Sequence, residues 1–300
     1  MKIGLIRPYE IEYNNHDVAD LDKAIKSLGH SIRRVYIDKI GVEIGSDGIG
    51  ITQMSAKGTP EPLDIDCAFL RHLGIIKDYE QFSSRLWSVR AIEQSGTLVM
   101  NNLMSWLFAS DKLASLSTLA KASLPVPHTL VTEDMFGAYR EVKRSGEVVV
   151  KPLRGAMGFG VFRLNDPDVA MHIFSYFTNI SKPMYLQKYL EKKGGGDYRV
   201  IVVGGEVIGA EFRKGTGWKS NVAQGAVPTA ARIDSEMKEL AVRATESLGL
   251  EYAGIDIAKT RDGYFILETN PTVSWQGFRR ATKIDVARIL VKHIVKRAKE

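Results

Sequence analysis

The stretch at residues 254–270 reads GIDIAKTRDGYFILETN and predicts the β-hairpin around which the fold is organised. Its middle, Arg261-Asp262-Gly263, has the composition of a three-residue hairpin loop with Gly263 in the left-handed conformation. Antiparallel pairing across such a loop fixes the register of the two strands. The predicted pairs are Ile255 with Thr269, Asp256 with Glu268, and Ile257 with Leu267. We therefore expect two acidic side chains to face each other across the hairpin.

Two carboxylates and an amide gather on one face of this predicted hairpin, because side chains alternate along a strand. That face carries Asp256, Glu268 and Asn270, and the other carries Ile255, Ile257, Phe265 and Leu267. Directly opposed like charges destabilise a sheet unless a cation neutralises them. Magnesium prefers hard oxygen ligands and completes its coordination with water and phosphate. The three polar side chains are therefore candidate metal ligands; the alternative is a hairpin with one solvated acidic face.

Length, apolar content and cysteine content narrow the class of protein. The 300 residues are 44% hydrophobic, which is enough for a substantial core divided between two or three lobes. The N-terminal MKIGLIRP has too few apolar residues for a signal peptide and the apolar runs are strand-sized, so we expect a cytoplasmic protein with no membrane partner. The single cysteine, Cys67, lies in an apolar run and cannot form an internal disulfide.

The net charge of +6 does not identify a partner by itself. A charge of this size on a large surface fits an anionic substrate, nucleic acid or no particular ligand. The basic residues are scattered, and the densest group, at 279–299, falls on a predicted amphipathic helix whose charged face is solvated. Nucleic acid is therefore not expected as a partner.

Strands and helices alternate through the first third of the chain. The predicted strands are KIGLI at 2–6, SIRRVYI at 31–37, CAFLR at 67–71 and TLVMN at 97–101, with helices over 17–28 and 81–93 between them. Such alternation indicates a parallel sheet. The first strand is not followed by the glycine fingerprint of dinucleotide binding, so a Rossmann cofactor is not predicted.

Arg71 ends its predicted strand on the edge where open α/β sheets place ligands. It is a candidate for binding the acid substrate, and the alternative is a surface arginine. The polar pair Asn101-Asn102 indicates a domain boundary before the next helix.

The middle of the chain combines lysines with a glycine-rich loop. Ser110-Asp111 predicts a helix start with Lys112 in its first turn, where a cation opposes the helix dipole unless an anion binds there too. VVVKP at 148–152 and a run at 161–164 predict a hairpin around the loop GAMGFG at 155–160. Glycines such as Gly158 and Gly160 expose backbone amides, so this loop is a candidate flap over phosphates, with Lys151 beside it. The alternative is a mobile loop without function.

A further strand and hairpin carry polar side chains. Residues 184–189 predict a strand followed by Glu191, which would accept from a ribose hydroxyl or, alternatively, lie in a solvated loop. Residues 198–203 and 206–213 form a predicted hairpin about Gly204-Gly205, which brings Asp197 and Arg213 to the same edge. Arg213 precedes a flexible polar segment, which suits oxyanion stabilisation; the alternative is simple solvent exposure.

The motifs VVVKPLRGAMGFGV, LQKYL, GDYRVIVVGG, KSNVAQGA, AGIDIA and LETNP, together with Lys112 after an aspartate, resemble the ATP-grasp superfamily and, within it, the RimK-type α-L-glutamate ligases. The resemblance runs from about residue 100 to the end, with the motifs in the same order. ETN followed by GFRRATKIDVA most resembles the ligases that add glutamate to tetrahydromethanopterin or to the deazaflavin coenzyme.

The resemblance implies an α/β fold with three parts. A β-α-β, pre-ATP-grasp domain would span residues 1–103, a central ATP-grasp lobe with the glycine-rich flap 104–184, and a C-terminal ATP-grasp lobe with the metal site 185–300.

The resemblance also implies roles for individual residues. Lys112 and Lys151 would bind the ATP phosphates, and Arg213 would face an acyl phosphate. Two magnesium ions, or manganese in their place, would bind to Asp256, Glu268 and Asn270. The remaining nucleotide contacts would come from Gly158 and Gly160 in the flap, Gln187, Lys188, Tyr189 and Leu190 at the adenine, Glu191, Asp197, and the active-site loop of Lys219, Ser220 and Asn221.

The implied reaction joins a small-molecule acid to an amino acid, with L-glutamate favoured, through an acyl phosphate that ATP supplies. Alternatives within the same chemistry are an amino-acid biosynthesis ligase acting on an acidic carrier protein and a ligase that modifies a protein C-terminus. An alternative of another class is a nucleotide-binding regulatory module. The resemblance leaves a homo-oligomer open.

Overall fold

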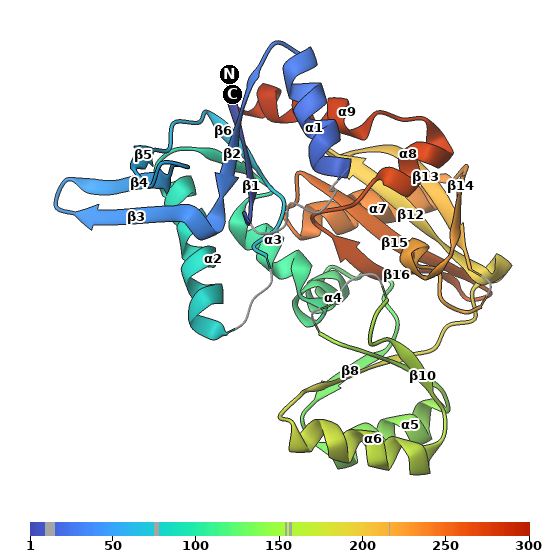
Figure 1. Ribbon diagram of the computed structural model, residues 1–300. Helices are drawn as coiled ribbons and strands as arrows, with labels where there is room; N and C mark the ends of the chain where they lie inside the picture. Colours follow the sequence, from blue (N-terminus) through green and yellow to red (C-terminus); the bar gives the residue numbers. More distant parts are fainter. Residues whose placement is uncertain (10–15, 75–77, 154, 156–157, 216) are drawn as a thin grey trace.

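The structure is a computed structural model that describes residues 1–9, 16–74, 78–153, 155, 158–215 and 217–300. Its strands form an N-terminal parallel sheet with a small sheet beside it, a central sheet and a C-terminal sheet. Figure 1 shows the central lobe, in green and olive, standing apart from the other two parts, which lie against each other. Within the described ranges, no helix has the length and apolar character needed to cross a membrane.

The N-terminal sheet is parallel, as the alternation of strands and helices predicted. Its strand order is β2-β1-β6-β7, and each neighbouring pair runs parallel. Its elements are β1 (Lys2–Arg7), α1 (His16–Ser27), β2 (Ser31–Tyr36), β6 (Cys67–Leu70), α2 (Tyr79–Gln94) and β7 (Leu98–Met100). Asp78 caps α2 by accepting a hydrogen bond from the Gln81 amide at 2.8 Å.

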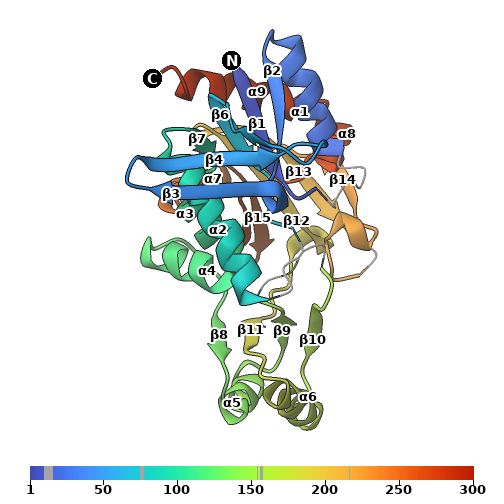
Figure 2. The same ribbon diagram turned by 60° about the vertical axis from the view of Figure 1, so that its left-hand side comes forward.

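A second, antiparallel sheet in this domain was missed by the sequence analysis. It follows the short helix η1 (Ile37–Lys39) and consists of β3 (Ile40–Gly45), β4 (Gly48–Met54) and β5 (Pro60–Pro62). Figure 2 shows the long β3–β4 hairpin crossing in front of α2. Ile44 near its tip is 82% exposed. Glycines interrupt the apolar alternation here, so the usual strand pattern is weak.

The central lobe is an antiparallel sheet covered by two helices. The strand order is β10-β9-β11-β8. Its elements are β8 (Thr129–Thr132), α5 (Met135–Ser145), β9 (Val148–Lys151), β10 (Phe162–Leu164), α6 (Pro167–Asn179) and β11 (Met184–Lys188). β9 and β10 pair on either side of the glycine-rich loop, as predicted. Ala156 and Met157 of that loop lie outside the described residues. β11 crosses the boundary that the sequence analysis set after residue 184.

The C-terminal lobe is built on a five-stranded antiparallel sheet of order β14-β13-β12-β15-β16. Its strands are β12 (Gly196–Val203), β13 (Glu206–Lys214), β14 (Val227–Ala230), β15 (Tyr252–Thr260) and β16 (Gly263–Asn270). The other elements are α3 (Leu103–Ser110), α4 (Lys112–Lys121), η2 (Lys193–Gly195), η3 (Val222–Gln224), α7 (Ser235–Ser247), α8 (Gln276–Thr282) and α9 (Val286–Arg297). Although the sequence analysis assigned α3 and α4 to the central lobe, both contact β16.

The β15–β16 hairpin confirms the most important predicted pair. Asp256 lies opposite Glu268, and Ile255 opposite Thr269. The predicted pairing of Ile257 with Leu267 is wrong, because the register shifts and Ile257 lies opposite Ile266. The loop is also shorter than predicted, since Thr260 pairs directly with Gly263.

The register shift changes which residues of β16 face the core. Leu267 is the extra residue of a β-bulge in β16, so no residue of β15 lies opposite it. The predicted apolar face is therefore wrong for Phe265 and Leu267: Tyr264 and Ile266 are buried in the core, while Leu267 lines the cavity described below.

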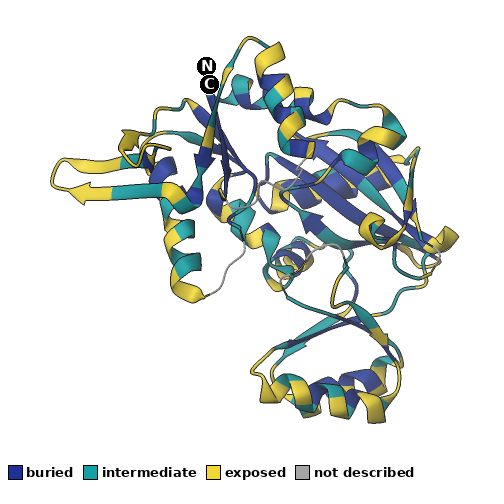
Figure 3. Ribbon diagram, in the orientation of Figure 1, coloured by how far each residue is buried: buried dark blue, intermediate teal, exposed yellow. Residues whose placement is uncertain are grey.

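The N-terminal domain and the end of the chain share one hydrophobic core. α9 packs against α1, and both termini lie close together in Figure 1. Figure 3 shows buried segments both in the N-terminal strands and in the helices beside them. The shared cluster joins Ile3, Leu5, Leu21 and Phe69 to Leu290, Val291 and Ile294.

Arg71 lies inside the contact between these two parts. Its guanidinium donates to the Tyr252 hydroxyl at 3.2 Å and to the Val273 carbonyl at 3.4 Å. It also lies over the Trp275 ring and 3.8 Å from Asp17. Arg71 is 2% exposed, so the alternative of a surface arginine is wrong. Its contacts join domains and do not face a substrate cavity.

Candidate active site

A cavity of about 540 Å³ lies between the central lobe and the C-terminal sheet. The flap, β11, the C-terminal sheet and α8 all contribute to its wall. The predicted site residues that line it are Lys112, Lys151, Gly158, Gln187, Lys188, Tyr189, Leu190, Asp197, Arg213, Lys219, Ser220, Asn221, Asp256, Glu268 and Asn270. Three candidates are not part of the wall: Arg71, Gly160 and Glu191, which is exposed.

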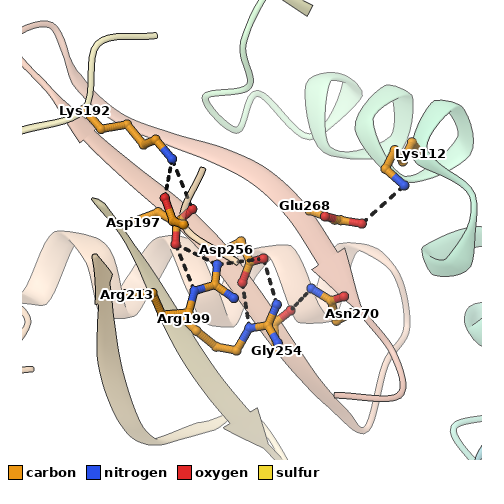
Figure 4. A network of polar contacts seen from close by, with 10 residues as sticks. Lys112, Lys192, Asp197, Arg199, Arg213, Gly254, Asp256, Glu268 and Asn270 are labelled. Carbon is orange, nitrogen blue, oxygen red and sulfur yellow. Dashed lines mark hydrogen bonds and ion pairs between the residues drawn. The ribbon is translucent and has the colours of Figure 1, made fainter. Parts of the chain in front are cut away.

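Asp256 lies at the centre of a buried network of charges (Figure 4). Arg199 donates to its two carboxylate oxygens at 2.8 Å each, from Nε and Nη2. The Nη2 atom of Arg213 lies 3.0 Å from Oδ2 of the same carboxylate. Burial opposes ionisation of Asp256, but the two arginines outweigh it and hold the pKa of this carboxyl well below its usual range. Asp256 is therefore ionised at neutral pH.

The other two candidate metal ligands are less tightly held. Glu268 has a side chain that is 32% exposed and lies 3.4 Å from the Lys112 ammonium. Asn270 donates from Nδ2 to the Gly254 carbonyl at 3.4 Å, which leaves its Oδ1 as an acceptor. Both are oxygen donors at the cavity wall.

These three side chains fit magnesium by the chemistry of their donors. A carboxylate has about four acceptor positions, and the arginines use three on Asp256. One position therefore remains for a cation. Together with Glu268 and Asn270 this makes a hard, all-oxygen set with room for phosphate and water, as magnesium requires. Within the described ranges, no group of three or more His, Cys, Asp or Glu side chains offers an alternative metal site.

Lys112, Lys151 and Lys192 line the same cavity as these carboxylates. Lys112 begins α4, whose N-terminus is capped by Asp111 through the amides of Leu113 and Ala114. Lys151 comes from β9, and Lys192, which the sequence analysis missed, follows β11. Cations that converge from separate elements, one of them at a helix N-terminus, form a site for an anion such as a phosphate chain.

Lys151 is held by Gln187, whose Oε1 accepts from its ammonium at 2.7 Å. The Gln187 side chain, predicted to face the adenine, therefore positions a lysine. Burial lowers the pKa of Lys151 to about 8; Glu268 opposes this shift, while Lys112 and Lys192 add to it. An ammonium with so low a pKa gains from a bound anion, because an opposite charge nearby favours the charged form.

We expect Lys151→Met to weaken ATP binding by roughly tenfold to a hundredfold at neutral pH, since one charge-assisted contact to phosphate is lost. Because wild-type Lys151 loses its charge as the pH rises through about 8, the affinity of the wild type should also fall there, and the variant should lack this step. Isothermal titration with ATP across this pH range measures both effects. Lys182→Met, at an exposed position in the same lobe, is the matched control. Unchanged affinity in Lys151→Met would refute the assignment.

The flap reaches the loop on the opposite side of the cavity. Gly158 has φ +73°, a conformation that favours glycine. A Cβ atom at this position would lie 2.6 Å from Oδ1 of Asn221. The glycine therefore lets the flap backbone approach the predicted active-site loop.

Gly158→Ala should weaken ATP binding, because the added methyl group pushes the flap away from Asn221. Gly146 gives a matched control, since it has the same φ of +73° in the same lobe but nothing within 4 Å of a built Cβ. Both alanine variants should lose about 1–2 kcal/mol of stability from backbone strain. Thermal unfolding and nucleotide titration of both proteins separate the effects. Equal ATP affinities in the two variants would contradict the role of the flap.

Arg213 is buried and fully engaged. It is 3% exposed, so the alternative of a solvent-exposed arginine is wrong. Nε and Nη2 donate to Asp197 Oδ1 at 2.9 and 2.7 Å, and Asp197 is its direct neighbour across β12 and β13, as predicted. Burial disfavours the charge on Arg213, but Asp256 and Asp197 outweigh it and raise the pKa above its ordinary value. Arg213 is therefore a fixed cation in the cavity wall.

Sequence reasoning missed four charged residues of this wall: Lys192, Arg199, Glu211 and Arg280. A signal existed for two of them. Asp197 and Arg199 are two residues apart on one strand, as are Glu211 and Arg213 on the next, so each pair shares a strand face. Lys192 follows a strand in a stretch without periodicity, and no pattern indicates it.

The fold and this cavity define an ATP-grasp protein. The solved structure of the ATP-grasp ligase PsnB complexed with minimal precursor, Mg and ADP aligns with 99% of this chain and 98% of that chain, with a TM-score of 0.74 and 21% identity. D-cycloserine synthetase DcsG aligns with 99% of this chain and 100% of that chain, with a TM-score of 0.72 and 18% identity. At these identities the likeness shows the fold.

The RimK-like ATP-grasp domain family matches residues 109–294, and the chain belongs to this family of ATP-dependent ligases, which use ATP and magnesium. The tetrahydromethanopterin:alpha-L-glutamate ligase of Methanococcus maripaludis is 29% identical over 242 residues, which cover 79% of this chain and 82% of the relative. A probable alpha-L-glutamate ligase of Maridesulfovibrio salexigens is 31% identical over 306 residues, which cover 99% of this chain and 96% of the relative. The resemblance found in the sequence is confirmed.

Proposed function

We propose that the protein joins L-glutamate to a carboxylate of a small-molecule coenzyme and releases ADP and phosphate. The observation that carries this proposal is that one cavity holds both kinds of group: the lysines Lys112, Lys151 and Lys192, and the oxygen donors Asp256, Glu268 and Asn270. The lysines can neutralise a phosphate chain directly, and the oxygen donors can do so through a bound cation. The names of the relatives support glutamate as the amino acid.

Each side of the cavity has its own task in this proposal. Lys112, Lys151 and Lys192 bind the phosphate chain, and the flap covers it. Asp256, Glu268 and Asn270 hold magnesium, either one ion or two, with manganese as an alternative. When bound, the metal neutralises the charge of the phosphates and makes the terminal phosphorus a better electrophile.

The proposed reaction has two steps. An oxygen of the substrate carboxylate attacks the γ-phosphorus of ATP, the bond to the leaving ADP oxygen breaks, and an acyl phosphate forms. The amine nitrogen then attacks the acyl carbon, and phosphate leaves with the electrons of the carbon–oxygen bond while the nitrogen gives up one proton and keeps the other as the amide N–H. The protein contributes position and charge: Arg213, held in the cavity wall by Asp197 and Asp256, would stabilise the transferring phosphoryl group.

Mass spectrometry of a small-molecule extract incubated with the protein, ATP, magnesium and isotope-labelled L-glutamate tests the proposal. We expect a new labelled compound, heavier than its precursor by one glutamyl residue, and an equal amount of ADP. ADP without a labelled product, or a product formed only with another amino acid, would contradict the choice of glutamate. Because ATP is supplied inside the cell, the proposed reaction places the protein in the cytoplasm.

A further inference from the structure

Glu211 is a buried carboxylate whose Oε2 atom has no partner among the residues that the structure describes. It lies on β13, is 3% exposed and lines the cavity. Its Oε2 atom has no hydrogen-bond partner, and within the described part of the chain neither oxygen forms an ion pair within 4 Å. An unpartnered carboxylate in such a place is costly to the fold. Because no contact within the fold offsets this loss of stability, the carboxylate is a candidate for binding a ligand.

Two arginines flank Glu211, but both form their ion pairs with other carboxylates. Arg199 lies directly opposite Glu211 across β12 and β13, and it donates to Asp256. Arg213 lies two residues further along β13, and it donates to Asp197 and approaches Asp256. Burial raises the pKa of Glu211, and the two arginines only partly offset this shift. Glu211 therefore stands beside a completed ion-pair network without being a member of it.

α8 lies over Glu211 and leaves a space there. A Cβ built on Gly277 would lie at contact distance, 3.6 Å, from the buried Oε2 atom of Glu211, so a larger residue at position 277 would fill the space beside this carboxylate. Gly277 itself lines the cavity. The position of α8 is fixed by α1, because Gln276 and Arg279 both donate to Asp20, at 2.9 and 2.6 Å.

Arg280, the next basic residue of α8, does not hold the helix against α1 as Arg279 does. Arg280 lines the cavity and is exposed at its rim. Among the described residues it has no ion-pair or hydrogen-bond partner, unlike its neighbour Arg279. Positions three apart on a helix share a face, so Arg280 projects from the same side of α8 as Gly277. A guanidinium is well shaped to bind a carboxylate through two parallel hydrogen bonds.

We propose that Glu211 and Arg280 form the subsite for a free α-amino acid, in which Glu211 receives the ammonium group and Arg280 a carboxylate. This inference rests on the proposed ligase function and names the residues that select its amine substrate. The pair recognises a zwitterion, because it offers one group of each charge on either side of the space above Gly277. In the strand register, Arg199 on β12 lies between Glu211 on β13 and Asp256 on β15. An ammonium group bound at Glu211 is therefore two strands, or about 10 Å, from Asp256 of the candidate metal set.

Isothermal titration of L-glutamate into the protein with magnesium and a non-hydrolysable ATP analogue tests this subsite. Glu211→Gln and Arg280→Gln should each weaken L-glutamate binding by roughly tenfold or more, since each loses a charge-assisted contact. The affinity for the ATP analogue should stay unchanged. N-acetyl-L-glutamate, which lacks the ammonium, should bind the wild type poorly, and Glu211→Gln should no longer distinguish it from glutamate.

Three further variants keep the test independent of folding. Gly277→Ala should weaken L-glutamate binding without loss of thermal stability, because it fills the space before Glu211 while alanine favours a helix. Glu206→Gln, exposed on the same strand, and Arg261→Gln, exposed at a hairpin tip, should behave like the wild type. Unchanged L-glutamate affinity in Glu211→Gln would overturn the subsite while ligase turnover of the wild type stands. Absence of binding and of ADP release with all the common amino acids would overturn the subsite and the proposed function together.

Discussion

Asp256→Asn and Glu268→Gln should both abolish ADP release, but only Asp256→Asn should also destabilise the fold. Each substitution removes a charge from the candidate metal set, which weakens magnesium binding. Asp256, however, is the partner of two buried arginines, while Glu268 is partly exposed and has Lys112 as its ion-pair partner at 3.4 Å. Removing one partner of a buried ion pair commonly lowers the free energy of unfolding by about 3–5 kcal/mol.

Chemical denaturation of the metal-free proteins and magnesium titration of ADP release measure these two effects separately. Glu206→Gln serves as a control for the loss of a carboxylate on the same sheet. Equal stability of Asp256→Asn and wild type would refute the network as a source of stability. If Glu268→Gln reaches full turnover at the same magnesium concentrations as the wild type, Glu268 is not a ligand of the metal.

Arg213→Lys should lower ADP release by on the order of a hundredfold to a thousandfold, while ATP binds with near-normal affinity. During transfer, charge spreads over the equatorial oxygens of the phosphoryl group, and a planar guanidinium follows that change better than an ammonium. Arg213→Ala should be equally slow. It should also be less stable, because it leaves Asp197 with Lys192 at 3.4 Å as its remaining ion-pair partner.

Nucleotide titration and steady-state ADP release from the same preparation decide the role of Arg213. Far-ultraviolet circular dichroism of Arg213→Lys confirms that the variant is folded at the assay temperature. An equal loss of ATP affinity and turnover would assign Arg213 to ground-state binding. No loss of either would leave it with a purely structural role in holding Asp197 and Asp256.

The parts of the fold that follow a simple periodicity could be predicted from the sequence. The predicted pairing of Asp256 with Glu268 rested on a three-residue loop. The loop is one residue shorter than predicted and the bulge adds one residue, so the two differences cancel and the predicted pair is observed. The bulge at Leu267 could not be predicted, because it inserts one residue without changing the composition of the strand. Three apolar residues in succession, Phe265-Ile266-Leu267, were the only indication of it.

The partners of the site residues were harder to predict than the residues themselves. Sequence patterns placed Arg213 and Asp197 on one edge, but they did not show that Arg213 is buried. Burial depends on tertiary packing, in which α8, distant in the chain, contacts β13. Arg71 illustrates the same limit: its place at a strand end suggested a ligand, whereas Tyr252 and Val273, far along the chain, enclose it.

The core that α9 shares with the first strands also constrains how the chain folds during synthesis. A ribosome makes Ile3, Leu5 and Leu21 long before Leu290, Val291 and Ile294, which cover them. The N-terminal domain therefore leaves the exit tunnel with an apolar face open, and this face stays available to chaperones until α9 emerges. Among the described residues, the main hydrophobic cluster of the central lobe draws on residues between Met135 and Leu186, so this cluster can form while the rest of the chain is still being translated.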